Sequence, residues 1–330
     1  MDAQRAFDAV VAAIEKGKRF VITSHVAQDG DNMSSQLALA MMLDQLGKSV
    51  VVVDADPVPE RWRFLPGVER VQQAERVTTP AGTTPPDFAI ILDTTRLTRT
   101  GLDWSAVRPG TVLINIDHHA SNELFGDINW VESDAPATCS LIHKLAKRLG
   151  VTIDEPIATC LFTGIMTDTG YFHYQGTTQE TFRAAAELIG CGASHVDLHR
   201  QVYDERPLPE MRLMGHAYAD LRTMMDERVA WIELTHETFE RAKADYNHVG
   251  SVANSLCTIQ GVDVGLTFEE RGDRRTLVEI RSRGAVDVGS IARELGGGGH
   301  RNASGCTLEV NLEQARAMVL SRIAEAVHAC

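Results

Sequence analysis

The first half of the chain alternates short continuous runs of apolar residues with longer segments in which apolar residues recur every three or four positions. Four runs rich in β-branched residues lie at 19–23, 49–53, 88–92 and 111–116, and residues 32–46 have the helical period. Apolar runs without polar alternation are typical of parallel strands that are covered on both faces. The pattern therefore predicts a doubly wound, mostly parallel α/β sheet.

The segment from 137 to 189 has the composition of helices, and we expect it to complete a first domain over residues 1–191. The stretch YDERPLPEMR, residues 203–212, combines prolines with charges that interrupt any core-forming period. We therefore predict a connector over residues 192–210.

The remaining residues, 211–330, predict a smaller α+β domain. Strand patterns at 229–234, 262–270 and 275–282 are interspersed with helical segments and predict a mixed sheet. The glycine-rich sequence ELGGGGHRNASG, residues 294–305, lies between the last two elements. Four consecutive glycines are, by themselves, typical of a flexible connector.

Composition and charge narrow the range of functions. The chain has 330 residues, of which 44% are hydrophobic and 23% charged, and its formal net charge is -13. This charge argues against a protein that coats long DNA or RNA, because such binding depends on the neutralisation of phosphates by Lys and Arg. A small anionic substrate is compatible with this negative charge if metal ions or a local basic pocket make the electrostatic potential positive where the substrate binds.

The compartment is also indicated by the sequence. No run of about 18 apolar residues is present, and the N-terminal sequence MDAQRAFDAV has acids where a signal peptide needs a basic region. The six cysteines are scattered without a C-x-x-C pair, so we expect reduced thiols. We therefore expect a cytoplasmic protein that does not enter a membrane.

The loop after the first strand, SHVAQDGD, places His25, Asp29 and Asp31 at the carboxyl end of that strand. Open α/β sheets bind their ligands at this edge. A structural explanation is equally available for these residues, because Asp-Gly is typical of turns and Asp31 is suited to cap the following helix.

Two other strands are followed at once by acidic or imidazole side chains. Asp93 comes directly after the run at 88–92, and Asp117, His118 and His119 come directly after the run at 111–116. A further aspartate, Asp168, ends a strongly apolar helix. Each residue alone is most simply explained as a cap or turn residue. Considered together, these positions favour one shared site.

Carboxylates that converge in one crevice repel each other and raise each other's pKa values unless cations neutralise them. A mixture of carboxylate oxygens and imidazole nitrogens without thiolates suits a divalent ion, with Mn²⁺ preferred over Mg²⁺ because histidines participate. The number of candidate ligands is sufficient for two ions, an arrangement used for displacement at phosphorus.

The sequences HVAQDGD, ILDTTRLTRTG, the Asp-His-His triplet and TDTG resemble the four motifs of the DHH phosphoesterase superfamily. RSRG and GGGGHRNASG are similar to the DHH-associated C-terminal domain, so the resemblance covers nearly the whole chain. By motif and length, the chain is most similar to the nanoRNase and pAp-phosphatase group, with cyclic-dinucleotide phosphodiesterases nearby.

The resemblance implies specific roles for the acidic and imidazole residues. Two manganese ions would share six ligands, namely His25 and Asp29 for one ion, Asp31, His118 and Asp168 for the other, and Asp93 as a bridge. Asp117 would orient His118 by a hydrogen bond to the ring nitrogen that does not bind the metal. His119 would face the scissile phosphate and protonate the leaving oxygen, and Arg99 would stabilise the phosphoryl oxygens.

The glycine-rich sequence has a second interpretation besides a connector. Glycines let backbone amides approach a phosphate closely, and Arg283 and His300 supply positive charge and directional hydrogen bonds. The resemblance implies that Arg283, Gly298, Gly299 and His300 bind the substrate, and that the cleft between the two domains is the active site.

The resulting expectation is a manganese-dependent phosphoesterase that uses two-metal activation of water to hydrolyse short 5'-phosphorylated oligoribonucleotides and 3'-phosphoadenosine 5'-phosphate (pAp). A cyclic-dinucleotide phosphodiesterase and a non-catalytic nucleotide sensor are the alternatives, and assembly into a homodimer is left open.

Two positions depart from the family pattern. Gln28 stands where proline is common, and Arg96 stands where an acid is often found.

Overall fold

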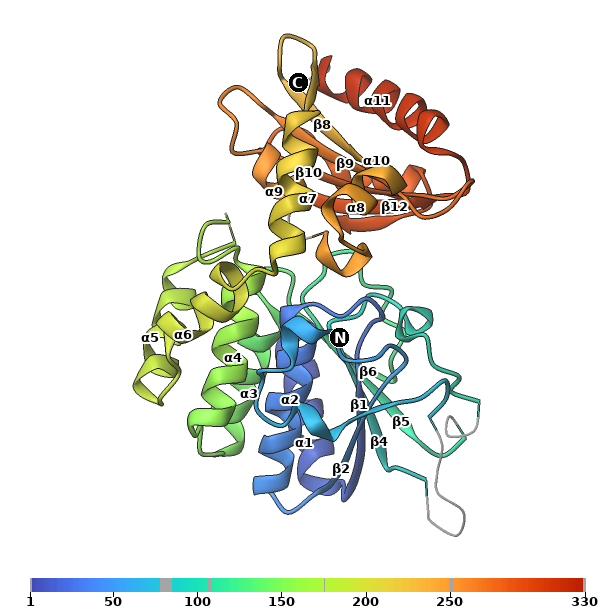
Figure 1. Cartoon of the computed structure of the whole chain (residues 1–330). Coiled ribbons are helices and arrows are strands. Elements are labelled where there is room, and N and C mark those ends of the chain that lie inside the picture. Colours follow the sequence, from blue (N-terminus) through green and yellow to red (C-terminus); the bar gives the residue numbers. More distant parts are fainter. Residues whose placement is uncertain (1, 78–84, 106–108, 175, 250–251, 329–330) are drawn as a thin grey trace. The chain divides into compact units, whose positions relative to one another are not determined.

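Six parallel strands form the centre of the N-terminal unit, Met1–Asp204, in the order β3-β2-β1-β4-β5-β6 (Figure 1). They are β1 (Arg19–Thr23), β2 (Ser49–Asp54), β3 (Val71–Gln73), β4 (Phe88–Leu92), β5 (Val112–Asp117) and β6 (Ile128–Val131). This is the strand order of a doubly wound α/β sheet, so the predicted fold class is confirmed. The computed structural model describes residues 2–77, 85–105, 109–174, 176–249 and 252–328.

Helices cover one face of this sheet (Figure 1). They are α1 (Ala3–Lys16), α2 (Gly30–Gln45), α3 (Thr138–Leu149) and α4 (Glu155–Asp168), followed by α5 (Gln179–Gly190), α6 (His195–His199) and a π-helix (Arg200–Asp204). Alternate strand residues such as Ile22, Ile90 and Ile114 pack with α1 to α4 in one buried core. The predicted helices are therefore present, and they share one buried core with the strands.

The opposite face of the sheet is covered mainly by loops. Val21, Ala89 and Leu113 pack there against Leu102 and Trp104, which do not belong to α-helices. A doubly wound sheet ordinarily has α-helices on both faces. The strands are still buried on both sides, which explains why their sequences are continuously apolar.

The C-terminal unit, Glu205–Cys330, contains a second six-stranded sheet in the order β11-β12-β10-β9-β8-β7. Its strands are β7 (Arg222–Met224), β8 (Val229–Leu234), β9 (Val264–Glu270), β10 (Thr276–Ser282), β11 (Gly298–His300) and β12 (Ala303–Leu308). β8 and β9 are parallel and the other neighbours are antiparallel, so the predicted mixed sheet is confirmed.

Helices cover both faces of this second sheet. They are α7 (Leu208–Ala219), α8 (His236–Ala242), α9 (Val252–Leu256), α10 (Val288–Glu294) and α11 (Leu312–His328). Val229 and Trp231 of β8 share a core with α10 and α11, whereas Ala230 and Ile232 of the same strand share one with α7 to α9. The alternation along β8 thus supports two layers of helices.

The stretch predicted as a connector is largely helical. It contains α6 and the π-helix, and α7 begins at Leu208. Pro207 is the N-cap of α7 and Pro209 lies in its first turn. Proline is well tolerated in a first helical turn, because the N–H groups there have no partner within the helix.

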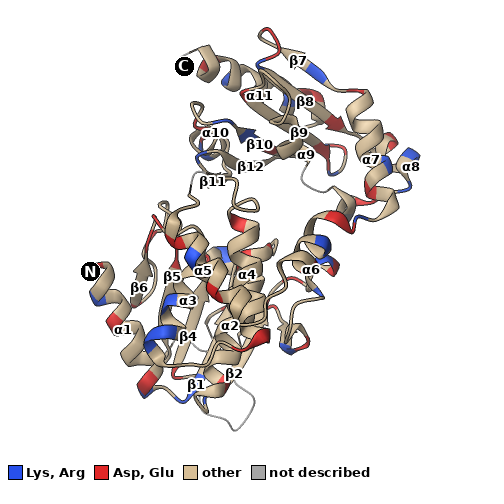
Figure 2. Cartoon of the chain, turned by 90° about the vertical axis from the view of Figure 1, so that its left-hand side faces the viewer, with Lys and Arg blue, Asp and Glu red and all other residues tan. Residues whose placement is uncertain are grey.

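Charged residues are distributed over both units, with Lys and Arg positions interspersed among Asp and Glu positions (Figure 2). Among the described residues, no helix is both long enough and apolar enough to span a bilayer.

Candidate active site

The loop after β1 carries the first candidate ligands. Ser24 Oγ donates a hydrogen bond to the carbonyl of Leu92 (2.6 Å) and so ties this loop to the end of β4. Asp29 is the N-cap of α2, and its Oδ1 accepts the backbone N–H groups of Asp31 (3.1 Å) and Asn32 (3.0 Å). The capping role considered for Asp31 therefore belongs to Asp29.

Asp31 lies in the first turn of α2 and is 1% exposed. Its carboxylate accepts the backbone N–H groups of Thr138 (2.5 Å) and Cys139 (2.9 Å) at the start of α3. Burial raises the pKa of Asp31 to about 7, and the charge of Asp93 adds to this effect. Gly164 of α4 provides the space, since a Cβ there would overlap Sγ of Cys139 and lie 2.7 Å from Oδ1 of Asp31.

Asp93 follows β4 directly and has a left-handed backbone, with φ of 52°. This conformation is uncommon for a residue other than glycine and often occurs at functional sites. The two carboxylate oxygens face different histidines: Oδ2 lies 3.5 Å from Nε2 of His25, and Oδ1 lies 3.5 Å from Nε2 of His118. Thr138 Oγ1 also donates a hydrogen bond to Oδ1 (3.1 Å). Asp93 is thus placed between two imidazoles.

The structure brings all six candidate ligands together. They form two sets whose ligand atoms lie within 4.8 Å of one another, His25 with Asp29 and Asp93, and Asp31 with His118 and Asp168. In the first set, His25 Nε2 is 3.6 Å from Asp29 Oδ2. In the second set, His118 Nε2 is 3.2 Å from Asp168 Oδ2.

The crowded carboxylates change the acidity of the histidines. Burial by itself lowers the pKa of His25, but hydrogen bonds and charges from Asp29 and Asp93 outweigh it and raise the pKa to about 10. The pKa of His118 is likewise raised, because Asp93 and Asp168 outweigh its burial. A divalent cation that binds these nitrogens has to displace their protons, so its affinity depends on pH.

Asp117 has a different partner from the one we predicted. Its Oδ1 lies 2.7 Å from Nδ1 of His119, whereas Nδ1 of His118 lies 3.1 Å from the carbonyl of Ala135. From His118, Asp117 accepts the backbone N–H (2.8 Å) and not a ring nitrogen. The prediction that Asp117 orients the His118 ring is therefore wrong, because the ring of His118 is oriented by a backbone carbonyl, a frequent partner of ligand histidines.

Arg99 lies in the short 3-10 helix Leu97–Thr100, and its carbonyl accepts the N–H of Val26 (2.8 Å). This contact places the Arg99 backbone beside the loop of His25. Within the described part of the chain, the Arg99 guanidinium forms no hydrogen bond or ion pair. Arg96 is exposed, and its Nε lies 3.7 Å from Oε1 of Glu123.

Gln28 is buried, and its hydrogen bonds fix the loop that carries His25. Its Nε2 donates a hydrogen bond to Oδ2 of Asp54 (2.8 Å), and the same oxygen accepts a hydrogen bond from Nε2 of Gln36 (3.3 Å). The backbone carbonyl of Gln28 accepts a hydrogen bond from Nε1 of Trp62 (3.4 Å). Burial raises the pKa of Asp54 to about 6. At position 28, where the resemblance implies a proline in many relatives, the glutamine side chain is thus held by a hydrogen bond.

The candidate substrate residues of the C-terminal unit lie on one part of its sheet. Gly298, Gly299 and His300 form β11, which pairs with β12, and His300 and Arg281 are both opposite Ala303. Gly299 has φ of 130°, and a Cβ there would lie 2.5 Å from the carbonyl of Ala303. The glycine-rich sequence is thus a paired hairpin. Arg283 follows β10 and is exposed, as is His300.

Sequence reasoning missed two supporting residues. Thr138 contacts both Asp31 and Asp93, and its position at the start of a predicted helix, with unpaired N–H groups, is a usable signal for an anion partner. Asn122 donates its Nδ2 hydrogen to Oδ2 of Asp117 (2.6 Å). Nothing in the local sequence marks Asn122, because it lies in an irregular segment.

Comparison with known proteins agrees with this geometry. Residues 19–165 match the DHH family, N-terminal domain, and residues 229–328 match the DHHA1 domain. A protein of Thermus thermophilus named bifunctional oligoribonuclease and PAP phosphatase NrnA is 34% identical over 326 residues, which cover 98% of this chain and 94% of the relative. The chain belongs to the DHH family.

Other DHH proteins are similar over most of their length. A relative of the same name from Bacillus subtilis is 28% identical, with 87% of this chain and 88% of the relative covered. The crystal structure of an exopolyphosphatase-related protein from Bacteroides fragilis has a TM-score of 0.87 and 27% identity, and covers 98% of this chain and 96% of that one. As a DHH phosphoesterase of the NrnA type, the chain is an enzyme that hydrolyses phosphoester bonds.

Proposed function

We propose that this DHH enzyme hydrolyses short 5'-phosphorylated oligoribonucleotides and pAp, and that it does so with two Mn²⁺ ions. The observation that carries the proposal is the position of Asp93, whose two oxygens face the histidines of two separate ligand sets. The substrates are suggested by the printed names of the relatives from Thermus thermophilus and Bacillus subtilis.

The residues present fit a pair of divalent cations. Each set combines one imidazole with two carboxylates, a donor mixture suited to Mn²⁺. His25, Asp29 and Asp93 would hold one ion, and Asp31, His118, Asp168 and the same Asp93 would hold the other. When bound, the two ions would neutralise the carboxylates and act as Lewis acids toward water and the phosphoryl group.

The remaining residues would position the reacting groups. Asp117 fixes the ring of His119 through Nδ1 and so orients it for proton transfer to the leaving oxygen. Arg99 would contribute positive charge near the phosphoryl oxygens. In the C-terminal unit, Arg283, His300 and the backbone N–H groups of Gly298 and Gly299 would bind a terminal phosphate or base.

The proposal is tested by turnover of four substrates with Mn²⁺ supplied, namely pAp, a 5'-phosphorylated diribonucleotide, cyclic di-AMP and pyrophosphate. We expect product from the first two and little from the others. Faster turnover of cyclic di-AMP would replace the proposal with the cyclic-dinucleotide activity. Tight nucleotide binding without turnover of any substrate would replace it with the sensor function.

A further inference from the structure

Three consecutive residues with a left-handed backbone follow the end of α4. The φ angles are 56° at Gly170, 56° at Tyr171 and 62° at Phe172. Two of these residues are aromatic, and for bulky side chains this conformation is unfavourable. Thr169 Oγ1 stabilises the turn by accepting the N–H of Phe172 (3.0 Å). Strain that is maintained this close to Asp168, a candidate metal ligand, suggests a functional reason.

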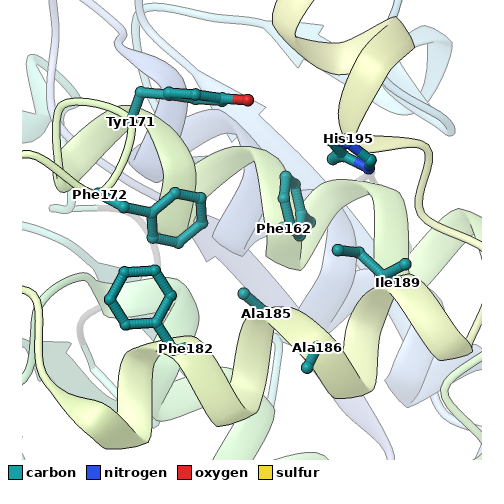
Figure 3. A pocket seen from close by; sticks show the side chains of 8 residues that line it. All are labelled: Phe162, Tyr171, Phe172, Phe182, Ala185, Ala186, Ile189 and His195. Atoms are coloured by element: carbon teal, nitrogen blue, oxygen red, sulfur yellow. The ribbon is translucent and has the colours of Figure 1, made fainter.

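The turn carries two neighbouring aromatic rings that also contact different partners. Phe172 stacks on Phe182, with centroids 5.4 Å apart, beside an apolar pocket of about 230 Å³. Tyr171 also makes T-shaped ring contacts with His199 (centroids 4.5 Å apart) and Tyr203 (5.9 Å). Figure 3 shows the rings of Phe172 and Phe182 facing each other; Tyr171 also lines the pocket, and its ring centroid lies 5.8 Å from that of Phe172. Tyr171 remains 38% exposed despite these contacts, so part of its side chain is accessible to a ligand.

Charged groups lie close to this aromatic surface. Burial raises the pKa of Tyr203 to about 12; the charge of Asp168 adds to this effect and that of Arg61 opposes it. The phenol of Tyr203 therefore lies within the electrostatic reach of a candidate metal ligand and of an exposed arginine. Since Tyr171 is three residues beyond Asp168, their Cα atoms are at most about 11 Å apart.

We propose that Tyr171 stacks on a nucleobase of the substrate while the phosphate of the same or the adjacent nucleotide lies at the ligand sets. A flat nucleobase fits a partly exposed aromatic ring. Stacking of this kind tolerates any base, because every base has a π-face. The inference rests on the proposed function and adds to it a base-binding surface within the N-terminal unit.

The kinetic test compares Tyr171→Ala and Tyr171→Phe on a 5'-phosphorylated diadenylate and on its analogue without bases. Tyr171→Ala should raise KM for the diadenylate by about five- to a hundredfold, whereas Tyr171→Phe should keep the parent value because its ring still stacks. KM for the analogue without bases should be the same in all three proteins. An equal rise in KM on both substrates, or no rise on either, would overturn the proposal.

Two further variants exclude a folding defect. Tyr171→Gly relieves the left-handed strain and so should keep the parent melting temperature, yet lose affinity as Tyr171→Ala does. Tyr218→Ala removes a tyrosine of similar exposure (36%) from α7 and should leave KM unchanged. If Tyr171→Gly binds the diadenylate as the parent does, the ring is not a base-binding group.

A binding measurement separates this proposal from the proposed function. The probe is a 5'-phosphorylated dinucleotide that contains 2-aminopurine, whose fluorescence falls on stacking, and it requires no turnover. Quenching in the parent and its loss in Tyr171→Ala would support the stacking even if the parent does not cleave the probe. Cleavage by the parent with equal quenching in Tyr171→Ala would overturn the stacking and leave the proposed function intact.

Discussion

The candidate ligands of the N-terminal unit and the candidate substrate residues of the C-terminal unit differ in their exposure to solvent. Asp31 and Asp93 are buried, and both receive hydrogen bonds from Thr138. Arg283 and His300 are exposed at the end of a strand and on a short edge strand. Under the proposed function, the chemistry would depend on fixed geometry, whereas substrate capture would depend on groups that the fold presents to solvent.

The largest expected effect comes from the residue that joins the two ligand sets. Asp93→Ala should reduce kcat by on the order of 10³-fold or more and should lower the bound Mn²⁺ from two ions per chain to one or none. Asp93→Asn serves as the control for shape, because it keeps the side-chain volume and removes the charge. Parent levels of turnover or of bound manganese in Asp93→Ala would contradict the assignment.

A second change tests whether the N-terminal site depends on tight packing. Gly164→Ala places a Cβ against Cys139 and Asp31 and should destabilise the unit by about 1–3 kcal/mol. The melting temperature should fall by several degrees, and turnover should fall with it because Asp31 is displaced. Gly190→Ala is the matched control, since a Cβ there has open space. Equal melting temperatures for the two variants would contradict the close approach.

The C-terminal residues should respond differently. His300→Ala should raise KM by about tenfold or more, because a hydrogen bond to a charged group is worth about 1.5–3 kcal/mol. Its kcat and melting temperature should remain near the parent values, since the side chain is exposed. A loss of kcat at constant KM would place His300 in the chemical step and remove the contrast between the units.

The smallest effect on turnover is expected at Asp54, which accepts hydrogen bonds from Gln28 and Gln36. Folding raises the pKa of Asp54 from the ordinary value near 4 to about 6, so the protonated form is favoured in the folded state. The stabilisation is present below pH 4 and is lost as the pH rises through 6. Asp54→Asn cannot ionise, and its free energy of unfolding relative to the parent should rise between pH 4 and 6 in denaturant titrations. A pH-independent difference would contradict this.

Much of the fold and of the ligand set follows from the sequence. Continuous apolar runs identified β1, β2, β4 and β5, and the polar residues directly after them converge because parallel strands end at one edge. The edge strands β3 and β6 were missed, since VQQ and INWV are short and half exposed. Loops on the second face of the sheet were also unpredictable, because a strand buried by loops has the same sequence as one buried by helices.

Details of the site were harder to predict than its location. The pairing of Asp117 with His119 depends on ring orientation, which neighbouring residues in sequence do not determine. The conversion of the glycine-rich sequence into β11 depends on the partner strand β12. The left-handed backbone at Tyr171 is likewise imposed by tertiary contacts, because a bulky aromatic residue does not favour it.

The wide spacing of the ligands along the chain has a consequence for its biosynthesis. Asp31 and Asp168 are 137 positions apart (168 minus 31), and α4, which bears Asp168, packs directly on α2, which bears Asp31. A nascent chain leaves the ribosome from its N-terminus, so the early strands are available long before the last carboxylate is translated. The ligand set of Asp31, His118 and Asp168 can therefore form only after α4 has been synthesised, whereas all residues of the set of His25, Asp29 and Asp93 are translated earlier.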